Sequence, residues 1–254
     1  MKNFILVGTQ RTGSSALAEL IGFHPDIACG WEWTQHVPRA RKILVAERAL
    51  AGDFSSLSAN GQAHMQQVFN PEKMWLGYRR LFRSSNKWLF HPKFAPALWV
   101  DRLEDHLKWL RTRPDIYIIH LRRDDHIAWL KSKFFSRESG AYVAKTYPDD
   151  IEIRIPLREA IARIQSKMWV DERLATLQDS NPYHQVWYED FSTDKIAVAH
   201  SVYQFLGCNK EAAKISLETG RKRQSSGPLS KGILNYSDLI TTLQSKHLMQ
   251  AGRN

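Results

Sequence analysis

The amino-terminal segment most constrains what this chain can fold into, because a short apolar run, a glycine-bounded loop and a helical pattern follow one another. The run at residues 4–7 (FILV) predicts a strand buried on both faces of a parallel sheet, and therefore a central strand. After the loop from Gly8 to Gly13, residues 14–21 (SSALAELI) have apolar side chains at helical spacing and a serine-rich start suited to capping. We therefore expect strand, turn and helix in succession.

Two later segments have the same organisation. Residues 116–121 (IYIIHL) predict a buried strand, and Asp124 or Asp125 can cap the helix that follows. A third strand is expected at 185–188, before a helical pattern over 196–206 that ends at Gly207. Strands that alternate with helices predict an α/β fold, in which a mainly parallel sheet is flanked by helices on both faces.

The length of 254 residues suits one domain that spans residues 1–254. Within it, residues of about 38–110 and 134–182 have largely helical patterns that are rich in Trp and Arg. We expect these two regions to be helical elaborations of the domain, on the side of its expected binding pocket.

Charge and cysteine content narrow the classes of partner and compartment. The 36 Lys and Arg residues outnumber 26 Asp and Glu, and the formal charge of +10 favours a polyanionic or phosphorylated partner. Two cysteines, Cys29 and Cys208, exclude a disulfide framework or a cysteine-rich metal site and favour a reducing compartment. Every apolar run is shorter than a signal-peptide core or a membrane span, so we expect a cytoplasmic protein without a transmembrane segment.

The loop from Gly8 to Gly13 is typical of a phosphate-binding site, because such loops expose backbone N–H groups beside the positive end of a helix. The loop of nucleotide triphosphatases places a Lys directly after its second glycine, whereas this chain has Ser14 there and carries its cation inside the loop, at Arg11. ATP hydrolysis is therefore disfavoured. An ordinary strand-to-helix turn with a chance glycine pair is the alternative interpretation.

Residues 8–15 (GTQRTGSS) resemble the 5′-phosphosulfate loop of the sulfotransferases that use 3′-phosphoadenosine 5′-phosphosulfate (PAPS). The resemblance implies a PAPS donor, the product 3′-phosphoadenosine 5′-phosphate (PAP), and an α/β fold of the P-loop type, related to that of nucleotide kinases. It also implies that the donor is bound by loop and helix-start residues, namely Gln10, Arg11, Thr12, Gly13, Ser14 and Ser15.

Two further segments resemble this family, in its order along the chain. Residues 120–123 (HLRR), followed by Ser132, are similar to the 3′-phosphate site, and of its two arginines we favour Arg122 over Arg123. A solvated arginine pair bridged to the two aspartates that follow is the alternative. Residues 186–191 (VWYEDF), with 205–208 (FLGC), resemble the family's Tyr-Glu-Asp strand end and its Phe-Leu-Gly helix, which adds Tyr188 to the expected donor site.

The likeness is closer to bacterial carbohydrate sulfotransferases, of the nodulation-factor and trehalose types, than to those that act on phenols and steroids. Residues 24–32 (HPDIACGWE) resemble the stretch that leads to an acidic residue in the bacterial enzymes, and 224–236 resembles their C-terminal segment. The basic run at 221–223 lacks the glycine that follows it in the phenol and steroid enzymes. Arg221 and Arg223 are thus expected either to contact the nucleotide or to form a solvated basic run.

The reaction needs compensation of charge on the leaving phosphate oxygen and a base for the acceptor hydroxyl. Arg11 is the candidate for the first role, and Glu32 is the candidate base because a short loop after the first helix can return it to the phosphosulfate loop. His36 is the next candidate base, followed by His91 and Lys93. A half-buried structural acid is the alternative for Glu32.

The sequence contains no histidine pair with a nearby carboxylate at metal-ligand spacing, so no metal is expected. Three other histidines, His24, His120 and His126, are expected to serve packing or hydrogen bonding.

We therefore expect sulfuryl transfer from PAPS, by in-line displacement, to a hydroxyl of a carbohydrate, glycolipid or other small acceptor. One alternative is a P-loop small-molecule kinase with an altered lysine. Another is a non-catalytic module that binds heparin-like or nucleic-acid polyanions, although the basic residues are dispersed and no nucleic-acid signature is present. The sequence leaves the oligomeric state open.

Overall fold

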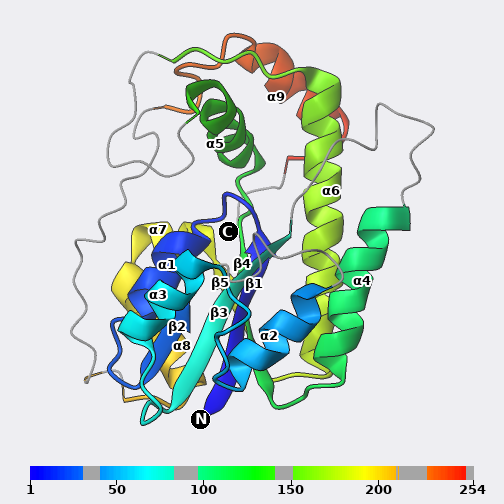
Figure 1. The fold of residues 1–254 in the computed structure, drawn as a ribbon. Helices are drawn as coiled ribbons and strands as arrows, with labels where there is room; N and C mark the ends of the chain where they lie inside the picture. Colours follow the sequence, from blue (N-terminus) through cyan, green and yellow to red (C-terminus); the bar gives the residue numbers. More distant parts are fainter. Residues whose placement is uncertain (31–40, 83–96, 141–150, 210, 212–227, 250–254) are drawn as a thin grey trace.

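A parallel sheet lies at the centre of the computed structural model, which describes residues 1–30, 41–82, 97–140, 151–209, 211 and 228–249 (Figure 1). In these residues the sheet has five strands in the order β2-β3-β1-β4-β5, and every neighbouring pair is parallel. The strands are β1 (Lys2–Thr9), β2 (Ile27–Gly30), β3 (Trp75–Phe82), β4 (Ile116–Arg122) and β5 (Tyr183–Trp187). The predicted central position of the first strand is confirmed.

Helices cover both faces of this sheet, which confirms the expected α/β class. The helices are α1 (Ser14–Ile21), α2 (Lys42–Leu50), α3 (Ala59–Val68), α4 (Ala97–Arg111), α5 (His126–Ser139), α6 (Leu157–Ala175), α7 (Tyr188–Thr193), α8 (Lys195–Phe205) and α9 (Tyr236–Ser245), with a 3₁₀ turn at Thr176–Asp179. In Figure 1, α1, α7 and α8 lie on one side of the sheet and α2, α4 and α6 on the other, with α5 and α9 above the carboxyl ends of the strands.

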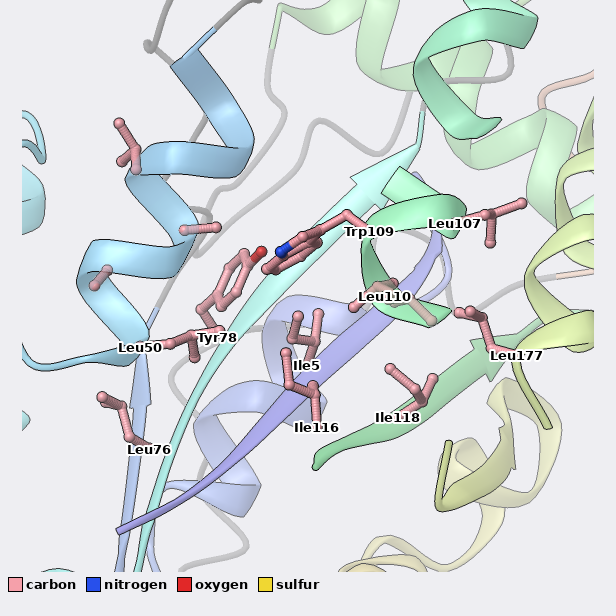
Figure 2. Close-up of a cluster of buried hydrophobic side chains, with 14 of the residues drawn as sticks. Ile5, Leu50, Leu76, Tyr78, Leu107, Trp109, Leu110, Ile116, Ile118 and Leu177 are labelled. Carbon is pink, nitrogen blue, oxygen red and sulfur yellow. The ribbon is translucent and has the colours of Figure 1, made fainter. Parts of the chain in front are cut away.

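The apolar run of β1 explains this layering. Its side chains alternate, so that Phe4 and Leu6 pack with α1 and α8, while Ile5 and Val7 pack with α2, α4 and α6. Figure 2 shows the cluster that contains Ile5, in which Ile5 and Tyr78 lie side by side on the sheet and Trp109 of α4 covers this face. A strand that is apolar on both faces must be covered by helices on both. The carboxyl end of β1 therefore lies between two layers of helices, at the edge of the sheet.

A third apolar cluster holds α5 over that edge. Trp129 and Phe134 of α5 pack with residues of α6 and α9, and an isolated parallel bridge joins Ile153 to Ile233. The carboxyl ends of the strands therefore face a fixed helix, α5.

Residues of about 38–110, predicted to be largely helical, contain α2, α3 and α4, but they also contain the strand β3, which the prediction lacked. β3 pairs with β1 along its whole length, from Lys2 opposite Trp75 to Thr9 opposite Phe82. Its sequence (WLGYRRLF), interrupted by a glycine and two arginines, is a weak strand signal alone, and pairing with both β1 and β2 decides its conformation. Region 134–182 contains α6 and the end of α5, as its helical pattern predicts.

The helix termini follow the predictions in part. α1 begins at Ser14 as expected, but its N-cap is Gly13, without a side-chain cap, so the prediction of serine capping is wrong. Asp125 caps α5 by accepting from the Ala128 N–H at 2.8 Å. The third predicted strand ends at Trp187, and Tyr188 begins α7. Within the described ranges, every helix is too short or too polar to cross a bilayer.

Candidate functional site

The loop between β1 and α1 has a backbone conformation that only particular residues tolerate. Arg11 has a φ of 69° and Gly13 a φ of 84°, both in the left-handed region. A Cβ at Gly13 would lie 2.7 Å from Cδ2 of Tyr188, so this position requires glycine for space as well as for conformation. Left-handed residues near helical ones turn successive N–H groups to one side, which makes a concave site for an anion.

Three consecutive carbonyl oxygens of this loop are held by side chains from different parts of the chain. The Thr12 hydroxyl donates to the Thr9 carbonyl at 2.8 Å, the Trp129 indole to the Gln10 carbonyl at 2.8 Å, and the Arg123 guanidinium to the Arg11 carbonyl at 3.1 Å. In a planar trans peptide the N–H lies opposite to the C=O. The three contacts therefore fix the directions of the N–H groups of Gln10, Arg11 and Thr12.

Arg11 reaches from this loop to α5. Its Nε donates to the Ser132 hydroxyl at 3.1 Å, so the first and second sequence motifs meet in space. Ser132 and Trp129 are three residues apart and lie on the same face of α5. One helix face thus contacts both the backbone and the cationic side chain of the loop.

Arg122 and Arg123 face opposite sides of the sheet, as consecutive residues at a strand end do. Arg123 is 5% exposed and lies over the Tyr188 ring, 4.2 Å from its centroid, so burial contradicts the solvated-pair interpretation for this arginine. Arg122 lies 4.7 Å from the Trp187 ring centroid and donates to Gln185 at 3.3 Å, while its buried Nε has no hydrogen-bond partner among the residues that the structure describes.

Glu189 joins the third motif to the second. Its Oε1 accepts from the backbone N–H groups of Asp124 and Asp125, at 3.0 Å each. The start of α7 is thereby tied to the turn between β4 and α5, which follows Arg122 and contains Arg123. Sequence reasoning named neither Glu189 nor Trp129 as part of the site.

A buried polar cluster lies behind the strand end, on the α6 side. His120 Nδ1 is 2.6 Å from the Tyr183 hydroxyl, and its Nε2 is 3.7 Å from Asp171, which also accepts from Lys167 at 2.7 Å. Burial lowers the pKa of His120 despite the opposing effect of Asp171. Burial alone would raise the pKa of Asp171, but the His120 contact and the Lys167 charge outweigh it and lower that pKa.

The predicted packing roles of the three histidines agree with this structure. His120 belongs to the buried cluster, His126 Nδ1 contacts the Leu248 carbonyl at 2.8 Å, and His24 Nε2 contacts the Asn209 carbonyl at 2.9 Å. Within the described part of the chain, no three His, Cys, Asp or Glu side chains are grouped so that they could hold a metal ion.

The structure brings most of the predicted donor residues to one edge of the sheet. Gln10, Arg11, Thr12 and Gly13 form the loop, and Ser14 and Ser15 form the first turn of α1. Other predicted residues lie outside the described ranges: Glu32, His36, His91, Lys93, Arg221 and Arg223. At this edge the loop N–H groups are oriented by their peptide planes, and Arg11, Arg122 and Arg123 supply three guanidinium groups at the carboxyl ends of β1 and β4. Such a set of donors suits an anion with more than one charged group.

Comparison with known proteins agrees with this chemistry. Residues 3–212 match the model of a family described as the sulfotransferase family. No curated protein matches the chain significantly. Among solved structures, mouse sulfotransferase SULT7A1 complexed with PAP matches with a TM-score of 0.51 and 10% identity. This match covers 96% of the present chain and 82% of the mouse chain. A sulfotransferase from Alicyclobacillus acidocaldarius matches with a TM-score of 0.47 and 16% identity, and the match covers 99% of the present chain and 97% of the bacterial chain. The mouse structure shows that the two chains share a fold.

Proposed function

The chain belongs to the sulfotransferase family, and we propose that it transfers a sulfuryl group from PAPS to a hydroxyl of a carbohydrate, glycolipid or other small acceptor. The observation that carries the proposal is the loop of residues 8–15, in which three consecutive carbonyls are anchored and Arg11 extends to Ser132. This arrangement supports a loop that is organised for the 5′-phosphosulfate before the donor arrives, which lowers the cost of binding.

The 3′-phosphate of the donor distinguishes PAPS from ATP, and we assign it to Arg122 and Ser132. Arg123 already donates to the Arg11 carbonyl and lies over Tyr188, which favours a role in bracing the loop. Among the described residues, the one hydrogen bond of Arg122 is a long one, to Gln185 at 3.3 Å. The PAP in the mouse neighbour's crystal supports a donor of this class.

In the proposed reaction the acceptor oxygen attacks sulfur, and the bond between sulfur and the bridging phosphate oxygen breaks in line with it. Negative charge develops on that phosphate oxygen, and the Arg11 guanidinium is the group proposed to compensate it. The acceptor proton is proposed to pass to Glu32, with His36 as the second candidate base. Arg221 and Arg223 are proposed as further contacts to the nucleotide.

The carbohydrate acceptor is the finer part of the proposal. It rests on the resemblance of residues 24–32 to bacterial carbohydrate sulfotransferases, and on Trp31 and Trp33, whose indoles are suited to stacking on a sugar ring.

A thermal-shift experiment tests the function. PAP, ATP and heparin are each added with and without magnesium, because a ligand that prefers the native state raises the melting temperature. We expect PAP to give the largest rise and magnesium to leave it unchanged. A larger rise with magnesium and ATP would favour a kinase with an altered lysine, and a rise with heparin alone would favour the polyanion-binding module.

A further inference from the structure

We propose that Trp129 is a positioning residue for the donor's 5′-phosphate end, acting through the Gln10–Arg11 peptide of the loop. The inference rests on the proposed function, which assigns the loop to that end of PAPS. The Trp129 indole N–H donates to the loop backbone, so the role we assign to it is to position the loop and not to take part in the reaction.

The contact that carries this inference is short, and its donor is a buried side chain. Trp129 is fully buried in α5, and its indole Nε1 donates to the Gln10 carbonyl at 2.8 Å. One turn further along the same helix face, the Ser132 hydroxyl accepts from Nε of Arg11. Residues on α5 therefore hold the backbone before Arg11 and the side chain of Arg11 itself.

Peptide geometry gives this contact a consequence for binding. The carbonyl of Gln10 and the N–H of Arg11 belong to one plane and point in opposite directions. With the carbonyl fixed toward α5, the Arg11 N–H must face away from α5. The direction of one phosphate-facing donor is thus set by an indole from another element.

The same contact opposes a conformational change that the loop would otherwise favour. Arg11 has a φ of 69°, which is unfavourable for a residue with a Cβ. Rotation of the Gln10–Arg11 peptide plane changes ψ of Gln10 and φ of Arg11 together. This rotation would return Arg11 to negative φ, which residues with a Cβ prefer, and would reverse the direction of its N–H. The indole hydrogen bond would be lost in that rotation, so it stabilises the binding-competent loop.

Trp129→Phe tests the inference because it keeps most of the ring and removes the N–H donor. The matched control is Trp109→Phe, since the Trp109 indole donates to Glu47 at 2.8 Å within the cluster between α2 and α4. Dissociation constants are measured by calorimetry for PAP, for adenosine 5′-phosphate and for adenosine 3′-phosphate.

We expect Trp129→Phe to weaken the affinities for PAP and for adenosine 5′-phosphate by the same factor, roughly three- to tenfold, since one hydrogen bond is lost. Affinity for adenosine 3′-phosphate should be unchanged, and Trp109→Phe should leave all three constants unchanged. Equal weakening of all three nucleotides by Trp129→Phe would assign Trp129 to general packing and overturn the inference. Unchanged affinity for PAP would overturn it as well.

A measurement on the wild-type protein covers the case in which Trp129→Phe does not fold. A phosphate that accepts from the Arg11 N–H polarises the same peptide and strengthens the bond from the indole to the Gln10 carbonyl. The indole proton resonance of Trp129 should therefore move downfield on saturation with PAP, and that of Trp109 should not. A stationary Trp129 resonance at saturation contradicts the inference. Failure of the wild-type protein to bind PAP is a separate result, which removes the proposed function and this inference with it.

Discussion

Arg11 and Ser132 are 121 positions apart in the sequence, yet Nε of Arg11 lies 3.1 Å from the Ser132 hydroxyl. The contact joins the loop after β1 to the middle of α5. A hydroxyl can accept from one group and donate to another, and this is the role that we propose for Ser132 between Arg11 and a phosphate oxygen. The two proposed phosphate positions of the donor are thus linked through one hydrogen bond.

Arg11→Ala should lower turnover more than it lowers affinity for PAP. Charge on the leaving phosphate oxygen is largest in the transition state, and only contacts that strengthen there accelerate the reaction. Loss of one such donor typically costs roughly 10²–10³-fold in turnover. Single-turnover rates at saturating PAPS, together with calorimetry of PAP, measure the two effects. Unchanged turnover would reduce Arg11 to an anchor.

Arg122→Ala and Arg123→Ala should differ in which nucleotide they affect. Arg122→Ala is expected to weaken the affinity for PAP by about 10- to 100-fold, because one charge-assisted contact to the 3′-phosphate is lost. The affinity for adenosine 5′-phosphate should be nearly unchanged. Arg123→Ala removes the donor to the Arg11 carbonyl, so it should weaken both nucleotides similarly. The reverse pattern would assign the 3′-phosphate to Arg123.

The loop and its neighbours were predictable because their signals are local. A four-residue apolar run, a glycine pair and helical spacing define β1, the loop and the start of α1 at Ser14. The cap at Asp125 follows from residue type in the same way. Each of these elements is dictated by the residues inside it.

The parts that were missed depend on distant partners. β3 is fixed by pairing with β1 and β2, and its own sequence carries two arginines that obscure the pattern. A tryptophan on an apolar helix face predicts core packing, and only the tertiary structure places the Trp129 N–H against the Gln10 carbonyl. Likewise, strand alternation separates Arg122 from Arg123, but the covering helices determine which one meets the loop.

Glu32→Gln should reduce turnover by about 10²–10⁴-fold if Glu32 is the general base, because the amide keeps the shape of the side chain and removes its basicity. Affinity for PAP should barely change. The pH dependence of the rate provides the control, since the acid-side fall should disappear in the variant. If that fall persists, His36 becomes the candidate, and a fully active variant removes Glu32 from the mechanism.

The buried histidine of β4 predicts how stability depends on pH. Burial lowers the pKa of His120 in the folded protein, so the unfolded chain binds more protons below its own value of about 6.5. Stability is therefore fully present above about pH 6.5 and is lost as the pH falls toward the lowered folded pKa.

Melting curves between about pH 8 and pH 5 check this sign, because they cover the unfolded histidine value. The melting temperature should fall on acidification, and more steeply in the wild type than in His120→Gln. The variant should keep a residual slope, because burial also lowers the pKa of His64, His126 and His184. Equal slopes for the two proteins would show that His120 does not contribute.

The most direct test of the account is a transfer assay with two labelled donors, [³⁵S]PAPS and [γ-³²P]ATP, offered with a panel of carbohydrates and other hydroxyl compounds. We predict ³⁵S-labelled product in the presence of a chelator, and strong loss of that product in Arg11→Ala. Transfer of ³²P that requires magnesium, with no ³⁵S transfer to any acceptor and no change of melting temperature with PAP, would contradict the account.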